Sequence, residues 1–221
     1  MTKQQVLSQI GESRLIPVLR ADSVDEAVAM ACAIEAGGIS VLEVTMTVPG
    51  AVEVIRRLVK EKGDHMLIGA GTVLDSETAR ASILAGALFI VSPALNCETV
   101  RLCRRYSVPV FAGALTPSEV VSAWEAGADA VKIFPCSAMG GAKYLRALKA
   151  PFPNIEMIPT GGVSLATVRD FLDAGSFALG VGADLADRSA IHAGRPGSIT
   201  ENARRYVELV QSATQVSLVG T

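Results

Sequence analysis

Residues 126–134 read Ala-Gly-Ala-Asp-Ala-Val-Lys-Ile-Phe and contain, in order, a helix end, a glycine and an apolar strand. The glycine can adopt the left-handed conformation that closes a helix. Residues 130–134 form a short apolar run, which is typical of a buried parallel strand. The same Ala-Gly helix end precedes a strand candidate at three other places, which are Ala36-Gly37, Ala85-Gly86 and Ala174-Gly175. We therefore expect a repeating helix–strand unit.

Eight apolar runs fit this unit as strands. They are Leu15–Arg20, Val41–Thr45, Met66–Ala70, Leu88–Ser92, Val108–Gly113, Ala130–Phe134, Ile155–Thr160 and Phe177–Gly182. Helical patterns separate them, and one more precedes the first. This favours a single (β/α)8 (TIM) barrel with an extra N-terminal helix over an open doubly wound sheet. No G-x-G-x-x-G follows the first strand, which weakens the dinucleotide-binding alternative. We expect one domain, 1–221, with its extra helix at 1–13 and a C-terminal tail at 214–221.

The expected helix starts carry capping residues. Ser23 with Glu26 has the spacing of a capping box, and so has Thr116 with Glu119, where Pro117 takes the first helical position. Three further N-caps are predicted, at Asp75, Asn96 and Ser164.

Composition excludes several classes of protein. The chain is 50% hydrophobic with a mean hydropathy of +0.39, but its apolar runs of about 4–7 residues are far shorter than the ~18 of a membrane helix. Its N-terminus has no signal-peptide pattern. Its four cysteines lack metal-binding spacing, so reduced thiols in the cytoplasm are expected. The net charge of −2 argues against a nucleic-acid binder.

Lys132 is the most informative residue, because it alone of six lysines lies within an apolar strand. An ammonium there is costly to keep charged, and a neutral lysine amine is a nucleophile for ketones. Side chains alternate along a strand, so Glu43 can point into the barrel with Val41 and Thr45. Lys132 and Glu43 would then face each other in an apolar interior. A structural ion pair between them explains these two residues equally well.

Glycines follow the last two strands. Thr160-Gly161-Gly162 and Gly180-Val181-Gly182 let backbone N–H groups approach an anion, and these two loops are the usual phosphate site of such barrels. The alternative, that the glycines only make tight turns, is less favoured because both loops carry them. Gly69-Ala70-Gly71-Thr72 is a weaker signal, in which Thr72 could donate a hydrogen bond to a substrate carboxylate.

Metal and thiol chemistry find little support in the sequence. His65 precedes a strand, at the wrong end of a barrel, and His192 has no second ligand at useful spacing. Cys136 follows Lys132 closely, but no histidine is placed to activate its thiol. We therefore predict no metal site and no cofactor.

Five motifs together resemble a known family. They are Leu42-Glu43-Val44-Thr45, Gly69-Ala70-Gly71-Thr72-Val73, Ser92-Pro93, Val131-Lys132-Ile133-Phe134-Pro135 and Pro159-Thr160-Gly161-Gly162-Val163. In order and spacing, from about Arg14 to Leu185, they are similar to the 2-keto-3-deoxy-6-phosphogluconate (KDPG) and 4-hydroxy-2-oxoglutarate (KHG) aldolases.

The resemblance implies a metal-independent class I aldolase, normally a homotrimer, that cleaves a 2-oxo-4-hydroxy acid to pyruvate and an aldehyde. It implies Lys132 as the Schiff-base lysine and Glu43 as the proton-transfer residue. Thr72 corresponds to the threonine that binds the substrate carboxylate. It also implies that Thr160, Gly161, Gly162 and Gly182 belong to the substrate-binding loops. Pro93 and Phe134 would line the pocket.

Two positions depart from the family pattern. Some members have an arginine four residues after the glutamate, where this chain has Thr47, and we expect Arg20 to supply that charge to the substrate carboxylate. Many members have a phosphate-binding serine where this chain has Ala183. The missing hydroxyl donor is worth about 0.5–1.5 kcal/mol when neutral, so the sequence leaves open whether the substrate is phosphorylated.

The sequence is also compatible with two other functions. A phosphate-binding barrel isomerase or epimerase would use Lys132 and Glu43 only as an acid–base pair, without a covalent adduct. A non-catalytic trimeric scaffold or ligand sensor would not need a lysine in an apolar strand.

Overall fold

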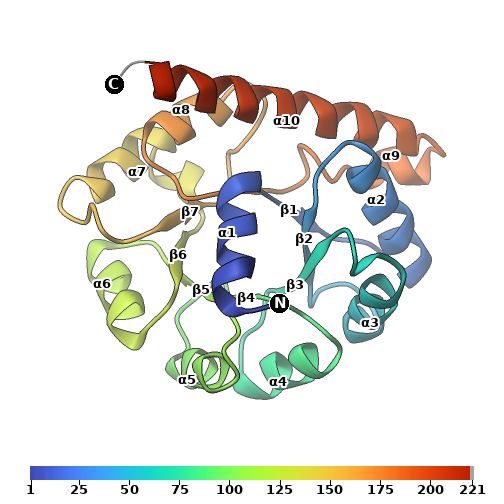
Figure 1. Cartoon of the computed structure of the whole chain (residues 1–221), viewed down its shortest axis with the longest axis horizontal. Coiled ribbons are helices and arrows are strands. Elements are labelled where there is room, and N and C mark those ends of the chain that lie inside the picture. Colours follow the sequence, from blue (N-terminus) through green and yellow to red (C-terminus); the bar gives the residue numbers. More distant parts are fainter. Residues whose placement is uncertain (220–221) are drawn as a thin grey trace.

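Eight strands and ten α-helices alternate along the described part of the chain in the computed structural model (Figure 1). The structure describes residues 1–219, and for 214–219 the backbone alone. The strands are β1 Leu15–Leu19, β2 Val41–Thr45, β3 Leu67–Gly71, β4 Ile90–Val91, β5 Val110–Ala114, β6 Ala130–Ile133, β7 Met157–Pro159 and β8 Leu179–Val181. The helices are α1 Lys3–Ser13, α2 Val24–Ala36, α3 Ala51–Lys62, α4 Ser76–Leu84, α5 Cys97–Arg105, α6 Pro117–Ala126, the 3-10 helix η1 Cys136–Met139, α7 Ala142–Lys149, α8 Val168–Asp173, α9 Arg188–His192 and α10 Pro196–Val219.

The strands form one parallel sheet that closes on itself. Their order is β7-β6-β5-β4-β3-β2-β1-β8, and every pair along it is parallel. An isolated parallel bridge between Thr160 and Gly180 joins the two ends of this order. The predicted (β/α)8 barrel is confirmed. Several strands are shorter than expected: Arg20, Ser92, Phe134, Thr160 and Gly182 each follow a strand end rather than belonging to the strand.

The extra N-terminal helix closes one end of the barrel. Val6 and Ile10 of α1 are buried against Ile16, Val41 and Leu67, which lie at the beginnings of their strands. Figure 1 shows α1 lying across the barrel opening. The apolar plug excludes water from this end, so polar chemistry inside the barrel is left to the carboxyl ends of the strands.

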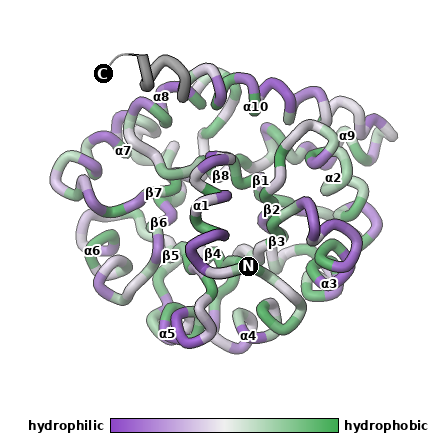
Figure 2. The backbone as a smooth tube through the Cα atoms, viewed as in Figure 1, coloured by the Kyte–Doolittle hydropathy of each residue, from purple (hydrophilic) through white to green (hydrophobic). Residues whose placement is uncertain are grey.

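The outer core lies between the strands and the surrounding helices. Outward-facing strand residues such as Leu42, Val44 and Ile68 pack with apolar helix residues such as Ile34 and Leu58 in one buried cluster. Strands buried on both faces explain why their sequences are continuously apolar. The helices in Figure 2 alternate between apolar and polar residues, as expected for elements with one buried face.

The helix starts follow their predicted N-cap residues with one exception, and one of the two expected capping boxes is incomplete. Thr116 and Glu119 form the complete capping box. Ser23 accepts a hydrogen bond from the backbone of Glu26, but the Glu26 carboxylate accepts from the Asp22 backbone instead of closing the box. Asp75 and Asn96 cap α4 and α5. The prediction of Ser164 as an N-cap is wrong, because a turn intervenes and α8 begins only at Val168.

Three of the four predicted helix-ending glycines adopt a left-handed conformation, with φ of +102° at Gly86, +95° at Gly127 and +86° at Gly175. The prediction for Gly37 is wrong: its φ is −85°, and Gly38 turns left-handed instead, at +93°. Gly37 is needed for packing, since a Cβ there would lie 2.3 Å from the Ala203 Cβ on α10.

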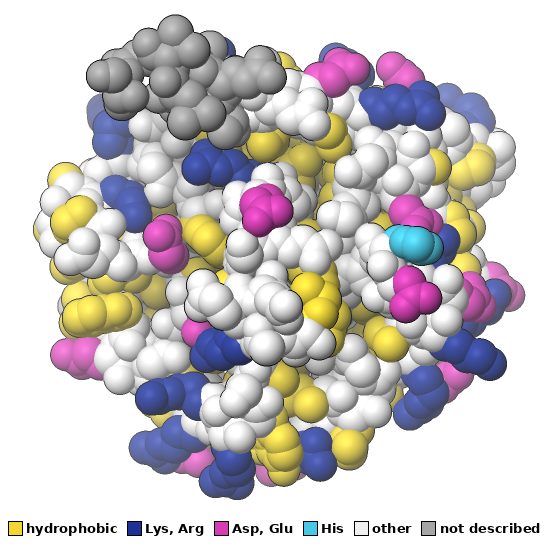
Figure 3. All heavy atoms as spheres, in the orientation of Figure 1, with side chains coloured by type: hydrophobic (Ala, Val, Ile, Leu, Met, Phe, Trp, Pro, Cys, Tyr) yellow, Lys and Arg dark blue, Asp and Glu magenta, His cyan; other side chains and the backbone are white. Residues whose placement is uncertain are grey.

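The long helix α10 lies over α2 and α8 at the edge of the barrel (Figure 1). It runs to Val219, so the described part of the expected tail, 214–219, continues this helix. No helix among the described residues is long and apolar enough to cross a membrane. On the face in Figure 3, basic and acidic side chains are interspersed around the rim without a broad basic area.

Candidate active site

Glu43 and Lys132 meet inside the barrel near the carboxyl ends of their strands. The Lys132 Nζ lies 3.6 Å from the Glu43 Oε1, and the two side chains are only 6% and 3% exposed. Glu43 comes from β2 and pairs in register with Val18 and Gly69. Since β2 and β6 are not neighbours in the sheet, the two side chains reach each other across the barrel interior.

The pair is close but incompletely satisfied. The Glu43 Oε1 is buried and accepts no hydrogen bond, and leaving a buried acceptor unpaired costs about 1–3 kcal/mol. The Lys132 Nζ lies 5.4 Å from the centroid of the Phe134 ring. Gly71 provides the space for the carboxylate, because a Cβ there would lie 1.8 Å from the Glu43 Oε1. A polar ligand that reaches the pair could donate the missing hydrogen bond to the Glu43 Oε1.

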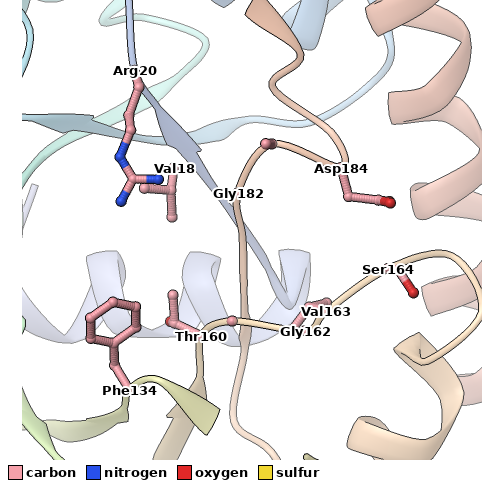
Figure 4. Close-up of a pocket in the computed structure, with 11 residues that line it drawn as sticks. Val18, Arg20, Phe134, Thr160, Gly162, Val163, Ser164, Gly182 and Asp184 are labelled. Atoms are coloured by element: carbon pink, nitrogen blue, oxygen red, sulfur yellow. The ribbon is translucent and has the colours of Figure 1, made fainter. Parts of the chain in front are cut away.

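A cavity of about 450 Å³ opens at the carboxyl ends of the neighbouring strands. It is lined by Val18, Arg20, Phe134, Thr160, Gly161, Gly162, Val163, Ser164, Gly182, Ala183 and Asp184 (Figure 4). Phe134 follows Lys132 by two residues, so the two side chains point to the same side of the chain. Because Phe134 is nearer the carboxyl end of the strand and lines the cavity, Lys132 lies deeper in the barrel than the cavity wall. The structure thus brings most of the expected substrate-binding residues into one space. Val18, Val163, Ser164 and Asp184 were not foreseen, although Val18 shares the inward side of β1 with Arg20.

The loops after β7 and β8 have backbone conformations and close contacts that a side chain at most of their glycine positions would disturb. Gly161 and Gly162 have φ of +92° and +79°. A Cβ on Gly162 would lie 2.6 Å from the Ser137 Cβ, and one on Gly180 would lie 2.1 Å from the Thr160 Oγ1. Gly182, by contrast, has open space around it. The glycines therefore serve the local geometry, and Gly161, Gly162 and Gly182 also line the cavity.

Lys132 and Glu43 are not among the residues that line the cavity, and three of the expected substrate-binding residues also lie outside the lining. Thr47 is exposed, and its hydroxyl is 2.7 Å from that of Thr45, which donates to the Leu19 carbonyl. Thr72 is half-buried, with a left-handed φ of +57°, which is unusual for a β-branched residue and indicates local strain. Pro93 leans over β5, since a Cβ on Gly113 would lie 2.1 Å from its carbonyl carbon.

Asp184, which follows the glycine loop after β8, is hydrogen-bonded to residues of α10. Asp184 accepts a hydrogen bond from the Tyr206 hydroxyl, and its carbonyl accepts another from the Asn202 side chain. Burial, and then the nearby carboxylate, raise the pKa of Tyr206. Figure 4 shows the Asp184 carboxylate pointing away from Arg20 and Gly182. The Asp184 carboxylate therefore turns away from the loop and toward α10.

The structure also shows the surroundings of His192 and Cys136, the side chains considered for metal and thiol chemistry. His192 has no second ligand at useful spacing in the sequence, but the fold brings ligand atoms of Asp22, Glu26 and His192 within 4.8 Å of one another. The carboxylates come from the start of α2, far away in sequence, and Arg188 already pairs with Asp22. Burial raises the pKa of the Cys136 thiol to about 11, which makes it a poor nucleophile.

The family model for KDPG and KHG aldolases matches residues 6–201 of the chain. The chain belongs to the KDPG and KHG aldolase family. Among curated relatives of this family, the 2-dehydro-3-deoxy-phosphogluconate aldolase of Haemophilus influenzae is 32% identical over 210 residues, which cover 95% of this chain and 99% of the relative. The KHG/KDPG aldolase of Escherichia coli K12 is 37% identical over 194 residues, covering 88% and 91% of the two chains.

A solved aldolase has the same barrel. The KDPG aldolase of Legionella pneumophila, with pyruvate captured as a covalent carbinolamine, superposes with a TM-score of 0.83 at 31% identity. The match covers 90% of this chain and 96% of that one. A carbinolamine is the adduct of an amine with a ketone, and in the present chain the buried amine inside the barrel is that of Lys132.

Proposed function

We propose that this protein is a class I aldolase that cleaves a 2-oxo-4-hydroxy acid, such as KDPG or KHG, to pyruvate and an aldehyde. The observation that carries the proposal is the buried Lys132 amine 3.6 Å from the Glu43 carboxylate, in a chain of the aldolase family. A lysine amine attacks a ketone to form a Schiff base, and Glu43 is placed beside it to exchange protons.

The reaction starts with addition of the Lys132 Nζ to the C2 carbonyl carbon of the substrate. The carbinolamine loses water and becomes an iminium, which accepts electrons from the C3–C4 bond. As the C4 hydroxyl loses its proton, that bond breaks, the aldehyde leaves and an enamine of pyruvate remains. Protonation at C3 and hydrolysis of the resulting iminium release pyruvate and restore the amine.

Glu43 acts as the proton carrier in these steps. Its Oε1 has no hydrogen-bond partner in the barrel, so it is free to take the proton of the carbinolamine or C4 hydroxyl, directly or through a water molecule. Because Gly71 leaves room for it, the carboxylate can remain beside the amine as the substrate binds.

The other expected site residues bind the substrate. We assign to Thr72 and Thr47, beyond β3 and β2, the region of the 2-oxo carboxylate, with Thr72 as the hydrogen-bond donor. Pro93 and Phe134 form apolar walls. Gly161, Gly162 and Gly182 offer backbone amides to the distal end of the substrate, beside Thr160 and Ala183.

We also propose that residues 1–221 act as one aldolase domain, as a homotrimer in the cytoplasm, and without a metal or cofactor. The family resemblance supports the trimer, and the absence of metal-binding spacing among the four cysteines fits a reducing compartment. Light scattering coupled to gel filtration tests the trimer, and a mass of one or two chains would contradict it.

Pyruvate release from KDPG, its galactonate epimer and KHG, measured side by side with a lactate dehydrogenase couple, tests the function. We expect turnover of at least one of them. Conversion of a sugar phosphate without pyruvate release would favour the isomerase or epimerase, and an absence of any turnover would favour the scaffold.

A further inference from the structure

A histidine and two carboxylates meet where the last unit of the barrel packs against the first. Asp22 lies in the turn before α2, Glu26 in the first turn of that helix, and His192 at the end of α9. The helix α9 lies against α2 at the edge of the barrel (Figure 1). The His192 Nε2 is 3.1 Å from the Glu26 Oε1 and 3.5 Å from the Asp22 Oδ2. None of the three residues lines the cavity of the candidate active site.

The Glu26 carboxylate is buried and held in place, and one of its oxygens is unsatisfied. Its side chain is only 8% exposed. The Oε2 accepts a hydrogen bond of 2.7 Å from the backbone N–H of Asp22, and the Oε1 faces His192. This Oε1 is buried and accepts no hydrogen bond from any described residue, although the His192 ring nitrogen is within contact distance. Buried charged oxygens are normally paired or bound to a metal ion, so the missing partner of this oxygen is a cation.

The spacing of the three ligand atoms fits a tetrahedral metal ion. Zinc binds nitrogen and oxygen ligands at about 2.0–2.2 Å, so the ligand atoms around it lie about 3.3–3.6 Å apart. Both distances from the His192 Nε2 are close to this range, and all three ligand atoms lie within 4.8 Å of one another. Asp22 is exposed in a turn, so its carboxylate can rotate to close the remaining distance. An imidazole ligand favours Zn²⁺ over Mg²⁺ and Ca²⁺, which take oxygen ligands.

Arg188 lies in the same cluster as a competing cation. Its guanidinium pairs with Asp22, and its Nε is 4.0 Å from the Glu26 Oε1. It does not satisfy Glu26, since the Arg188 Nε also lacks a hydrogen-bond partner among the described residues. One guanidinium between two carboxylates leaves an excess of negative charge beside the imidazole. Because the Arg188 side chain is half-buried rather than enclosed, it can move into solvent when a divalent cation binds.

We propose that Asp22, Glu26 and His192 bind a divalent transition-metal ion of the Zn²⁺ type in exchange for Arg188. The ion joins the segment after β8 to the turn after β1, two strands that are neighbours in the sheet. It clamps the last barrel unit to the first and stabilises the folded chain by mass action. The sequence predicted no metal site because the ligands on α2 and α9 are far apart along the chain. The ion takes no part in cleavage, so this inference is independent of the proposed aldolase function.

Zn²⁺ titration, followed by calorimetry and by thermal melts, tests the proposal. The full chain carries Cys32→Ser and Cys97→Ser for this purpose, because these two thiols are exposed and thiols bind Zn²⁺ themselves. The protein should bind one Zn²⁺ per chain and melt several degrees higher with it, whereas Mg²⁺ at the same concentration should leave the melt unchanged. His192→Gln should weaken Zn²⁺ binding by about tenfold or more. The matched control is His65→Gln, which changes the other histidine of the sequence, is exposed, and should leave the affinity unchanged.

Arg188→Gln distinguishes a metal site from a purely ionic contact between the two helices. Removing the competing cation should tighten Zn²⁺ binding several-fold, and melts without metal check that each variant folds. Weaker Zn²⁺ binding in Arg188→Gln would overturn the proposal, because Arg188 would then support the ion instead of competing with it. An absence of Zn²⁺ binding in the chain that retains both histidines, or equal losses in His192→Gln and His65→Gln, would overturn it too.

Discussion

Gly71→Ala is expected to disable the active site without unfolding the barrel. A Cβ at position 71 would lie 1.8 Å from the Glu43 Oε1 and 2.4 Å from the Glu43 Cγ and Cδ, whereas ordinary contact begins at 3.4 Å. The carboxylate must therefore move by about 1.6 Å. The contact is with the end of a flexible side chain, so the displacement is easier for the fold to accommodate than a clash with backbone.

Catalysis, in contrast, depends on the position of that carboxylate. A misplacement of about 1 Å can cost on the order of 10²-fold in rate, so kcat for pyruvate release should fall by about 10²-fold or more. Borohydride trapping with pyruvate should still label the protein, because Lys132 itself is untouched. Steady-state kinetics and a thermal melt of the variant measure the two effects.

Gly197→Ala is the matched control, since Gly197 has no positive φ and a Cβ there meets nothing within 4 Å. Its kcat should equal that of the wild type, and its melting temperature should be equal or slightly higher, because alanine is favoured over glycine in a helix. A Gly71→Ala enzyme with wild-type kcat would refute the reasoning, because it would mean that turnover does not depend on where the Glu43 carboxylate lies.

Three further predictions follow from the same site. Glu43→Gln keeps the shape and removes the proton carrier, so kcat should fall by about 10²–10⁴-fold while the iminium still forms slowly; near-wild-type turnover would reduce Glu43 to a structural partner of Lys132. Ala183→Ser should lower KM for KDPG several-fold and leave KM for KHG nearly unchanged, whereas equal effects would mean that position 183 does not face the distal anion. Treatment with EDTA should leave the wild-type rate unchanged, and a loss restored by Zn²⁺ or Mg²⁺ would indicate metal-dependent cleavage.

Local sequence signals predicted most of the barrel because they arise from local physics. Short apolar runs identified all eight strands, and Thr116 with Glu119 marked a helix start through contacts within a single turn. Predictions were wrong where a distant segment decides the local geometry. Gly37 has ordinary dihedral angles because its missing side chain admits Ala203 of α10, which lies far away in sequence.

In the candidate site, too, local signals predicted some features, whereas contacts between distant segments determine others. Strand alternation sufficed to expect Lys132 and Glu43 inside the barrel, because it is a property of each strand alone. The hydrogen bond between Asp184 and Tyr206 joins a loop to α10, and the contact of His192 with Glu26 joins α9 to α2. Neither follows from spacing, since each depends on how the final helices return across the barrel.

Covalent trapping tests the central claim most directly. The wild-type protein is incubated with pyruvate, reduced with borohydride, digested and analysed by mass spectrometry. We predict loss of activity and one reduced pyruvyl group on the peptide that contains Lys132, and no adduct in Lys132→Arg, whose guanidinium stays protonated and cannot add to a ketone. An adduct on any of the other lysines, or none at all, would contradict the Schiff-base mechanism.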